Sequence, residues 1–402
     1  NLQMDAQHSS TERNKKAETE LLESVSSLKS MICGFADQIE KDRQLPDELL
    51  AALHRTSLFR MLLPQPFGGL EVTPGTFFSV IENIAIFDAS TAWCLCQANG
   101  CSMAAAFLPS SVATEIWKDD NCAVLAWGPG KGQAKTVDGG FLLSGRWSFI
   151  SGGRHAKWLG GFADIVDENG QLRRDGDNNP LQRTFLFPAT KATRHETWNV
   201  IGLLGTGSDD FSVENILVPE THILSRDDPA TRLYSEPLYM FPAISLYATG
   251  FAATALGVAR GVFEAFISNV SDKVPRAQTH KLRDNNVIQA DIGRCKARLA
   301  AARTFLQQEV YDIWDSVFYS RQLSVEQRMR IRLSSTYAIH EAKTVVDMLY
   351  EHAGATAIFA TSPFERRFRD IHTIAQQVQG RQSHFQTVGA FLLGNEPDLR
   401  LV

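Results

Sequence analysis

The sequence lacks the charge and cysteine patterns that mark several classes of protein. Its 402 residues carry a formal net charge of −5, so the basic surplus of a nucleic-acid-binding protein is missing. The six cysteines show no regular spacing, which indicates a reducing compartment and predicts a cytoplasmic protein. Cys94, Cys96 and Cys101 lie in an alanine-rich run without the paired spacing of zinc modules, so we expect buried thiols and no metal site.

The sequence also lacks an apolar run of the density that a membrane-spanning helix requires. Residues 89–114 and 237–259 carry no charge, but proline and many small or polar residues interrupt both segments. We therefore expect helices buried in a large core and no membrane span. A glycine-rich nicotinamide fingerprint is missing at every expected strand–helix junction, which excludes a dinucleotide site of that type.

The patterns that are present divide the chain into three parts. Apolar residues recur at three- and four-residue spacing in 21–39, 288–317 and 325–352, as in amphipathic helices. Between about 122 and 218, short apolar runs separated by Gly, Pro, Asn and Asp predict strands. We therefore predict a mainly α protein with a central β domain of barrel or sandwich type. The expected domains are an N-terminal helical domain 1–118, a middle β domain 119–226 and a C-terminal helical bundle 227–402, whose apolar faces favour oligomerisation.

The most informative stretch is 145–158, Gly-Arg-Trp-Ser-Phe-Ile-Ser-Gly-Gly-Arg-His-Ala-Lys-Trp. A strand pattern ends there in a Ser-Gly-Gly turn surrounded by aromatic residues. Glycines allow a close approach of a ligand to the backbone, so the stretch suits a flat ring lying against a strand edge. An ordinary hairpin corner is the alternative interpretation of the same residues.

Four motifs in this order resemble the acyl-CoA dehydrogenase superfamily. They are the start Asp88-Ala-Ser-Thr-Ala-Trp93, the signature Gly145-x-Trp147-x-Phe149-x-Ser151-Gly152, the segment 198–208, and the end Arg366-Arg-Phe-Arg-Asp370 with Gly389-x-x-Leu-Leu-Gly394. The signature is similar to the oxygenase components of two-component flavin-dependent monooxygenases, the branch that includes p-hydroxyphenylacetate, steroid-ring and dibenzothiophene monooxygenases. The resemblance implies a helical domain, a middle β domain and a C-terminal four-helix bundle.

The resemblance also implies an activity. In that branch a separate flavin reductase supplies reduced flavin, here expected to be FMN with FAD as the alternative. The reduced flavin reacts with O₂ to give a C4a-hydroperoxide that hydroxylates an aromatic or heterocyclic small molecule, in a homotetramer. The alternatives are a flavin dehydrogenase or oxidase of the acyl-CoA dehydrogenase type and a catalytically idle member kept as a binding or assembly protein.

Site residues follow from the same resemblance. Ser151 is expected beside flavin N5, with Phe149 and Ile150 bordering the ring and Trp127 and Gly128 at its other edge; core packing is the alternative for the two aromatic residues. The expected substrate contacts are Trp93, Gln97 and Trp198. The flavin phosphate is expected to meet cations from the loop before the long bundle helix of a neighbouring subunit, namely Lys273, Arg276 and Arg283, each of which could instead belong to a solvated turn.

Two departures from the family pattern concern catalytic groups. Most acyl-CoA dehydrogenases have a glutamate shortly after the Arg-Asp motif, but residues 371–395 contain no Asp or Glu, which favours the oxygenases. A carboxylate base on the preceding helix, as in some family members, is the alternative. Many related oxygenases have a histidine seven residues after that motif, where this chain has Gln377, a side chain that cannot act as a base near neutral pH. His384 is the candidate substitute, with a structural role as the alternative, and His372 is a further candidate that fits a helix surface equally well. Without a base, the substrate would be one that needs no deprotonation, as in N- or S-oxygenation.

Overall fold

The computed structural model describes residues 2–226 and 228–402, with side chains from residue 12 onward. Its first part is helical, as predicted, with the helices α1 (Leu2–Asp42), α2 (Asp47–Arg55), α3 (Pro74–Phe87), α4 (Ala89–Ser102) and α5 (Ser110–Ala113). Helix α3 begins where Thr73 accepts a hydrogen bond from the Thr76 amide. Asp88 does the same for the Thr91 amide at the start of α4, so both helices have side-chain caps for amides that the helix itself leaves unpaired.

The middle part is one mixed eight-stranded sheet. Its strands are β1 (Leu125–Trp127), β2 (Gly130–Val137), β3 (Gly140–Trp147), β4 (Trp158–Val166), β5 (Gln182–Pro188), β6 (Thr193–His195), β7 (Asp210–Pro219) and β8 (Ile223–Leu224). They are ordered β6-β7-β3-β2-β4-β5-β8, with β1 pairing with β4. Strand β2 was not predicted, because Gly-Lys-Gly-Gln-Ala-Lys-Thr-Val has little apolar content and only Ala134 is buried.

The sheet is strongly curved. Strands β3 and β5 are separated by two other strands, a distance of about 14 Å in a flat sheet. Yet Phe141 of β3 meets Phe185 of β5 with ring centroids 5.3 Å apart, and Trp147 meets Phe187 at 6.2 Å. The sheet therefore folds around a small hydrophobic core of its own, in agreement with the predicted barrel or sandwich.

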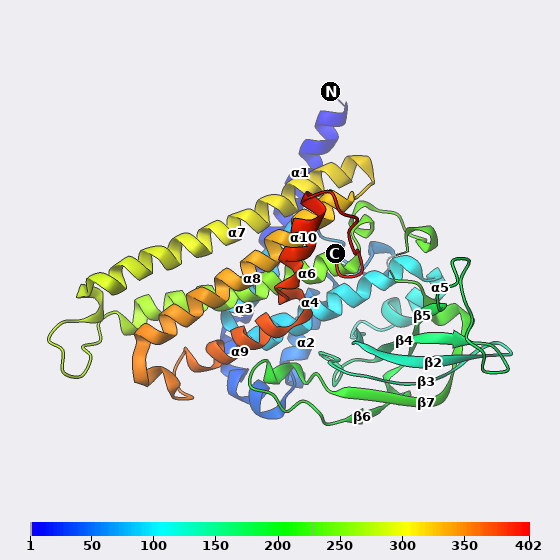
Figure 1. Ribbon diagram of the computed structural model, residues 1–402, viewed down its shortest axis with the longest axis horizontal. Coiled ribbons are helices and arrows are strands. Elements are labelled where there is room, and N and C mark those ends of the chain that lie inside the picture. Colours follow the sequence, from blue (N-terminus) through cyan, green and yellow to red (C-terminus); the bar gives the residue numbers. More distant parts are fainter. Residues whose placement is uncertain (1, 227) are drawn as a thin grey trace.

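The last part is a helical bundle. It contains α6 (Ala243–Ala265), α7 (Asn286–Ser320), α8 (Val325–Ala353), α9 (Glu365–Gln376) and α10 (Ser383–Leu392). Figure 1 shows α7 and α8 running side by side, with the loop between α6 and α7 at the end of the molecule away from the sheet. Among the described residues, Ala243–Val270 is the one helical stretch long and apolar enough to cross a membrane, but 72% of its window is buried in the protein, as in a helix at the centre of a core.

One hydrophobic core runs through both helical parts of the chain. Helix α6 packs along α3 and α4, and most buried apolar residues of the first five helices and of the bundle form a single cluster. A Cβ on Gly257 of α6 would lie 2.3 Å from the Glu82 carbonyl oxygen of α3, so glycine is required for this close packing. The division into three domains stays a prediction, because this core joins the first and third of them.

Candidate functional site

The turn after β3 holds an aromatic side chain in the open. Phe149 has φ +53°, a strained conformation for a bulky residue, and 62% of the side chain is exposed. Hydrogen bonds on both sides hold the turn: the Ile150 amide donates to the Asp209 carbonyl, and the Gly152 amide to the Thr206 carbonyl. The Phe149 ring stands edge-on to Trp198, with centroids 6.0 Å apart. The result is a rigid apolar surface of the size that a flat ring needs.

The hydroxyl of Ser151 lies in a buried polar chain beside this surface. The Trp93 indole of α4 donates to Ser151 Oγ at 3.0 Å. Ser151 Oγ lies 2.7 Å from Ser208 Oγ, which in turn lies 2.7 Å from Thr206 Oγ1. Thr206 donates to the Leu203 carbonyl at 2.8 Å. The three hydroxyl residues are buried, so these hydrogen bonds do not compete with bulk water.

Strand β1 and helix α4 form a second wall next to Ser151. Gln97, one turn after Trp93, donates to the Trp127 carbonyl at 3.2 Å. Trp93 stacks on Phe251 of α6 with centroids 3.8 Å apart. Two pairs of predicted residues are therefore in direct contact, Trp93 with Ser151 and Gln97 with Trp127. Gly128, placed in the same site, is needed for packing, because a Cβ there would lie 2.0 Å from the Ser148 carbonyl oxygen.

Arg226 adds a positive charge to this wall. Its guanidinium lies over the Trp127 ring, 4.6 Å from the centroid. Burial raises the pKa of the Cys101 thiol to about 11 and raises that of the Tyr247 phenol, and in both cases the Arg226 charge acts in the opposite direction. No carboxylate in the described part of the chain pairs with this arginine. Arg226 is therefore a cation that contacts aromatic rings and has no carboxylate partner among the described residues.

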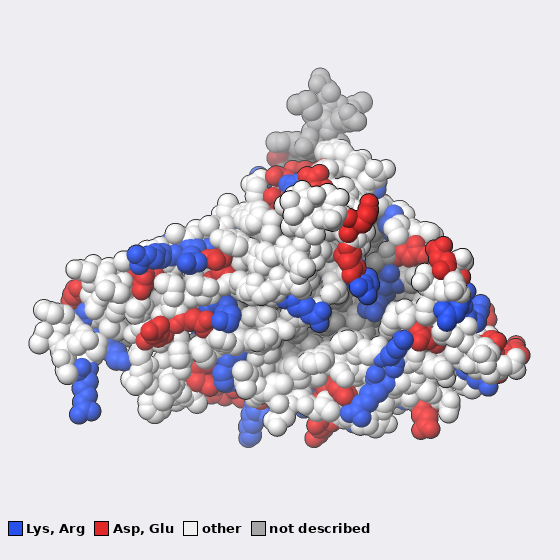
Figure 2. Space-filling model, viewed as in Figure 1, with Lys and Arg blue, Asp and Glu red and all other residues white. Residues whose placement is uncertain are grey.

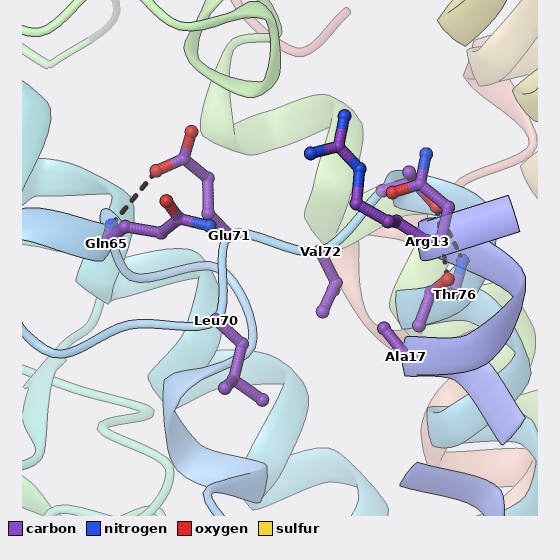
Figure 3. A pocket seen from close by; sticks show the side chains of 9 residues that line it. Arg13, Ala17, Gln65, Leu70, Glu71, Val72 and Thr76 are labelled. Carbon is purple, nitrogen blue, oxygen red and sulfur yellow. Dashed lines mark hydrogen bonds between the residues drawn. The ribbon is translucent and has the colours of Figure 1, made fainter. Parts of the chain in front are cut away.

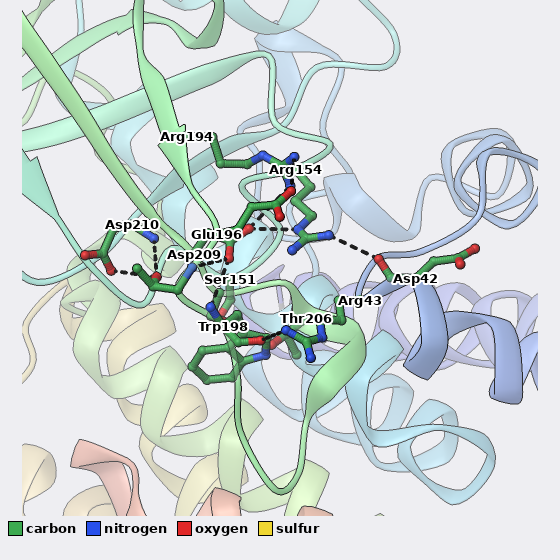
Figure 4. Close-up of polar contacts among 12 residues, drawn as sticks. Asp42, Arg43, Ser151, Arg154, Arg194, Glu196, Trp198, Thr206, Asp209 and Asp210 are labelled. Carbon is green, nitrogen blue, oxygen red and sulfur yellow. Dashed lines mark hydrogen bonds and ion pairs between the residues drawn. The ribbon is translucent and has the colours of Figure 1, made fainter.

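The loop that carries Trp198 is fixed by a buried carboxylate (Figure 4). Asp209 is fully buried, and its Oδ1 accepts the backbone amides of Thr197 and Trp198 at 3.1 Å each. Its Oδ2 accepts from Arg154 at 2.8 Å and pairs with Arg194 at 3.4 Å. Arg154 directly follows the Ser151 turn. Asp209 therefore connects that turn to the loop that carries Trp198, the ring that Phe149 contacts.

A second buried carboxylate reaches the same loop from the bundle. Asp370 of α9 accepts the Leu203 amide at 2.7 Å, and the Leu203 carbonyl accepts the Trp198 indole at 3.0 Å. Burial raises the pKa of Asp370 to about 7, and the hydrogen bond from Leu203 opposes this rise. Asp370 of the Arg-Asp motif is therefore a structural support for the loop in this molecule.

The proposed replacements for the family's histidine make contacts with nearby backbone. Gln377 accepts the Gln379 amide at 2.7 Å with its side-chain oxygen. His384 is 3% exposed, and its Nε2 lies 2.7 Å from the Val378 carbonyl, so Nε2 carries the hydrogen. Burial lowers the pKa of His384 to about 4, and His372 pairs with Asp347. None of these contacts reaches Ser151, and the catalytic roles of Gln377 and His384 stay predictions.

The predicted phosphate-binding cations lie in the loop between α6 and α7. Lys273 donates to the Ala353 carbonyl and to Thr356, and Arg283 pairs with Asp272. Arg276 is exposed. Figure 1 places this loop far from the sheet of the same chain, so these cations could meet a flavin at Ser151 only in a neighbouring subunit.

Several residues of the site were not identified from the sequence. Ser208 and Thr206 lie within the motif 198–208, yet their hydroxyls become informative only once Ser151 is beside them. Arg226 follows the last strand without any motif.

The cavity in Figure 3, of about 280 Å³, lies elsewhere, between α1 and residues 65–76, and is lined by Arg13, Asn14, Ala17, Gln65, Leu70, Glu71, Val72, Thr73 and Thr76.

Known proteins share the fold and the sequence pattern of this chain. Residues 249–381 match the family model "Acyl-CoA dehydrogenase, C-terminal domain". The crystal structure of the 3-HSA hydroxylase from Rhodococcus sp. RHA1 is similar with a TM-score of 0.86 and 26% identity, over 95% of this chain and 99% of that one. The fold is therefore that of the acyl-CoA dehydrogenases, in which α-helical regions flank a β domain.

Relatives in sequence define the branch. The indole-3-acetate monooxygenase of Pseudomonas putida is 30% identical over 361 residues, 90% of each chain. The FADH₂-dependent resorcinol hydroxylase, oxygenase component, of Rhizobium sp. (strain MTP-10005) is 25% identical and covers 98% of both chains. The chain belongs to the flavin-dependent monooxygenases with the acyl-CoA dehydrogenase fold, as an oxygenase component that uses reduced flavin.

Proposed function

We propose that this monooxygenase inserts one oxygen atom into an aromatic or heterocyclic small molecule at the Ser151 site. The observation that supports this most is the exposed Phe149 surface next to the buried Ser151 hydroxyl in the same turn. Phe149, Ile150 and Ser151 would hold one side of the flavin ring, with Trp127 and Gly128 at its other edge. Reduced flavin supplies the two electrons needed to convert O₂ and substrate to hydroxylated product and water.

The site does not favour the alternative of an acyl-CoA dehydrogenase. Such an enzyme needs a carboxylate base, and residues 371–395 contain none. Asp370, the carboxylate that directly precedes this segment in the sequence, is buried, and its Oδ1 accepts the Leu203 amide. The alternative of an idle fold member is opposed by the buried hydroxyl chain at Ser151. Buried polar groups stabilise a fold no more than apolar side chains of the same size, so their presence here favours a role in ligand binding.

Assembly and location complete the proposal. We propose a homotetramer in the cytoplasm, served by a separate flavin reductase. Large apolar side chains are exposed in two places on the bundle, namely Ile358 and Phe359 after α8 and Leu392 and Leu393 at the end of α10, each more than half exposed. Their burial between subunits would also bring the α6–α7 loop of one chain to another, where Lys273, Arg276 and Arg283 could meet the flavin phosphate. Sedimentation of the purified protein tests the tetramer.

The proposed activity is tested with purified protein, an NADH-driven flavin reductase, O₂ and candidate substrates. We expect oxygen consumption coupled to a product that is 16 mass units heavier, the mass of one oxygen atom, as required for a monooxygenation. Titrations with FMN and FAD decide which flavin is used, since FMN was expected from the resemblance and the resorcinol hydroxylase is named for FADH₂. Bleaching of a bound flavin by acyl-CoA without O₂ would support the dehydrogenase instead, and protein that binds no flavin would be an idle fold member.

Arg226 indicates that the substrate is an aromatic acid. The aromatic rings of Trp93, Trp127 and Tyr247 provide apolar contact, and the guanidinium, which pairs with no carboxylate among residues 12–226 and 228–402, can bind a carboxylate. The named substrate of the Pseudomonas putida relative, indole-3-acetate, has this chemistry. Replacement of Arg226 by glutamine should therefore raise KM for an aromatic acid by about tenfold, since a charge-assisted hydrogen bond contributes roughly 1.5–3 kcal/mol.

Paired substrates make this prediction specific. KM for indole-3-acetate is compared with KM for indole, which lacks the carboxylate, and Arg226→Gln should affect the acid alone. Arg226→Lys keeps the charge and should retain most of the affinity. The surface variant Arg174→Gln controls for a change in net charge. Equal effects on acid and neutral substrate would contradict a carboxylate contact.

A further inference from the structure

The buried hydroxyl chain fixes the direction of the Ser151 hydrogen. A carbonyl can only accept, so Thr206 places its single hydroxyl hydrogen on the Leu203 oxygen, 2.8 Å away. Thr206 must then accept from Ser208 across 2.7 Å, which uses the hydrogen of Ser208. Ser208 in turn must accept from Ser151 across 2.7 Å. The hydrogen of Ser151 is thus committed to Ser208.

Ser151 is left with one hydrogen-bonding position, and that position is an acceptor. A serine oxygen has two lone pairs, one of which accepts the Trp93 indole at 3.0 Å. The second lone pair has no partner among the described residues. The Leu203 carbonyl that anchors the chain also accepts the Trp198 indole at 3.0 Å and the Thr206 amide at 3.2 Å. A ligand atom that approaches Ser151 must therefore be a donor.

The two redox states of flavin differ in this property at N5. Reduced flavin carries an N–H at N5, whereas oxidised flavin presents only a lone pair there. We infer that Ser208 and Thr206 are positioning residues that hold Ser151 as an acceptor, so that the site selects reduced over oxidised flavin. This inference rests on the proposed function, because it requires flavin N5 to lie beside Ser151.

Selection of this kind suits an enzyme whose flavin comes from a separate reductase. The reduced form would bind by donating its N5 hydrogen to Ser151 Oγ. In the oxidised form left after turnover, the N5 lone pair would face the lone pair of Ser151 Oγ. The cost of that opposition favours release of oxidised flavin to the reductase. The hydroxyl chain therefore links the local geometry of Ser151 to the exchange of flavin between two proteins.

The test measures binding rather than turnover. The Kd of reduced FMN is measured under anaerobic conditions and the Kd of oxidised FMN in air, for the wild type and for Ser208→Ala. The wild type should bind reduced FMN at least about tenfold more tightly, the worth of roughly one hydrogen bond. In Ser208→Ala the Ser151 hydroxyl can rotate to donate, so the preference should fall about tenfold. Thr206→Val should act in the same direction, and Ser208→Thr should keep the preference.

Controls separate this effect from loss of structure. Ser334→Ala removes a buried serine from α8, far along the chain from the site, and should leave the redox preference unchanged. Circular dichroism checks that each variant is folded. Equal Kd values for both redox states in the wild type would overturn the inference, as would an unchanged preference in folded Ser208→Ala and Thr206→Val. If hydroxylated product still forms in these cases, the proposed function stands and the hydroxyl chain is structural only.

Discussion

Replacement of Ser151 by alanine should lower the yield of hydroxylated product per O₂ consumed by on the order of 100-fold, the effect of losing one preorganised hydrogen bond at a reacting centre. The substitution removes the Ser151 acceptor that we propose for the ligand. It also leaves the Trp93 indole and the Ser208 hydroxyl without their partner in a buried site. Reduced flavin would still react with O₂, and the oxygen would leave as H₂O₂.

The measurement is a comparison of product with H₂O₂ at equal oxygen consumption. Ser148→Ala is the matched control, because Ser148 lies in the same turn and is not part of the hydroxyl chain. Ser151→Thr keeps the hydroxyl and should recover much of the yield. A Ser151→Ala protein that couples O₂ to product as the wild type does would remove Ser151 from the catalytic site.

Replacement of Asp209 by alanine should cost about 3–5 kcal/mol of unfolding free energy, as expected when one partner of a buried ion pair is removed. Asp209 is fully buried, and the Arg154 side chain is only 12% exposed. Without the carboxylate, this guanidinium keeps its charge in a largely apolar environment. The amides of Thr197 and Trp198 lose their acceptor as well.

The neighbouring residue provides the control. Asp210 pairs with Arg146, whose side chain is 52% exposed, so Asp210→Ala should cost no more than about 1 kcal/mol. Urea denaturation with a constant slope gives the two differences. Hydrogen exchange of the Trp198 amide should rise in Asp209→Ala. If both variants unfold at the same urea concentration, Asp209 contributes no more than a surface carboxylate.

The sequence was informative where the relevant signal is local. Helices α1, α7 and α8 were predicted because their apolar residues repeat at helical spacing over many turns. Strand β2 was missed because it has little apolar content. Its place in the sheet depends on backbone pairing with β3 and β4, which a single sequence does not show. The Ser151 turn was recognised because its motif is contiguous.

The site beyond that turn depends on contacts between distant segments. Ser208 is 57 residues from Ser151, and only the pairing of β3 with β7 brings them together. Arg226 reaches Trp127 through the placement of β8 at the end of the sheet, which no local pattern records. The family resemblance led us to predict Trp93, Gln97 and Trp127 as site residues. It did not reveal the direction of the hydrogen bonds that hold Ser151.

The shared helical core limits how this enzyme can be recombined with its relatives. Helix α6 carries Phe251, which stacks on Trp93, and Tyr247, which stacks on Phe251, and it packs along α3 and α4 at glycine-dependent distances. A chimaera that took α6 from another member without α3 and α4 would place new side chains against unmatched neighbours. Altered substrate range should therefore be sought by exchanging these three helices as one block, although 140 residues of sequence separate α4 from α6.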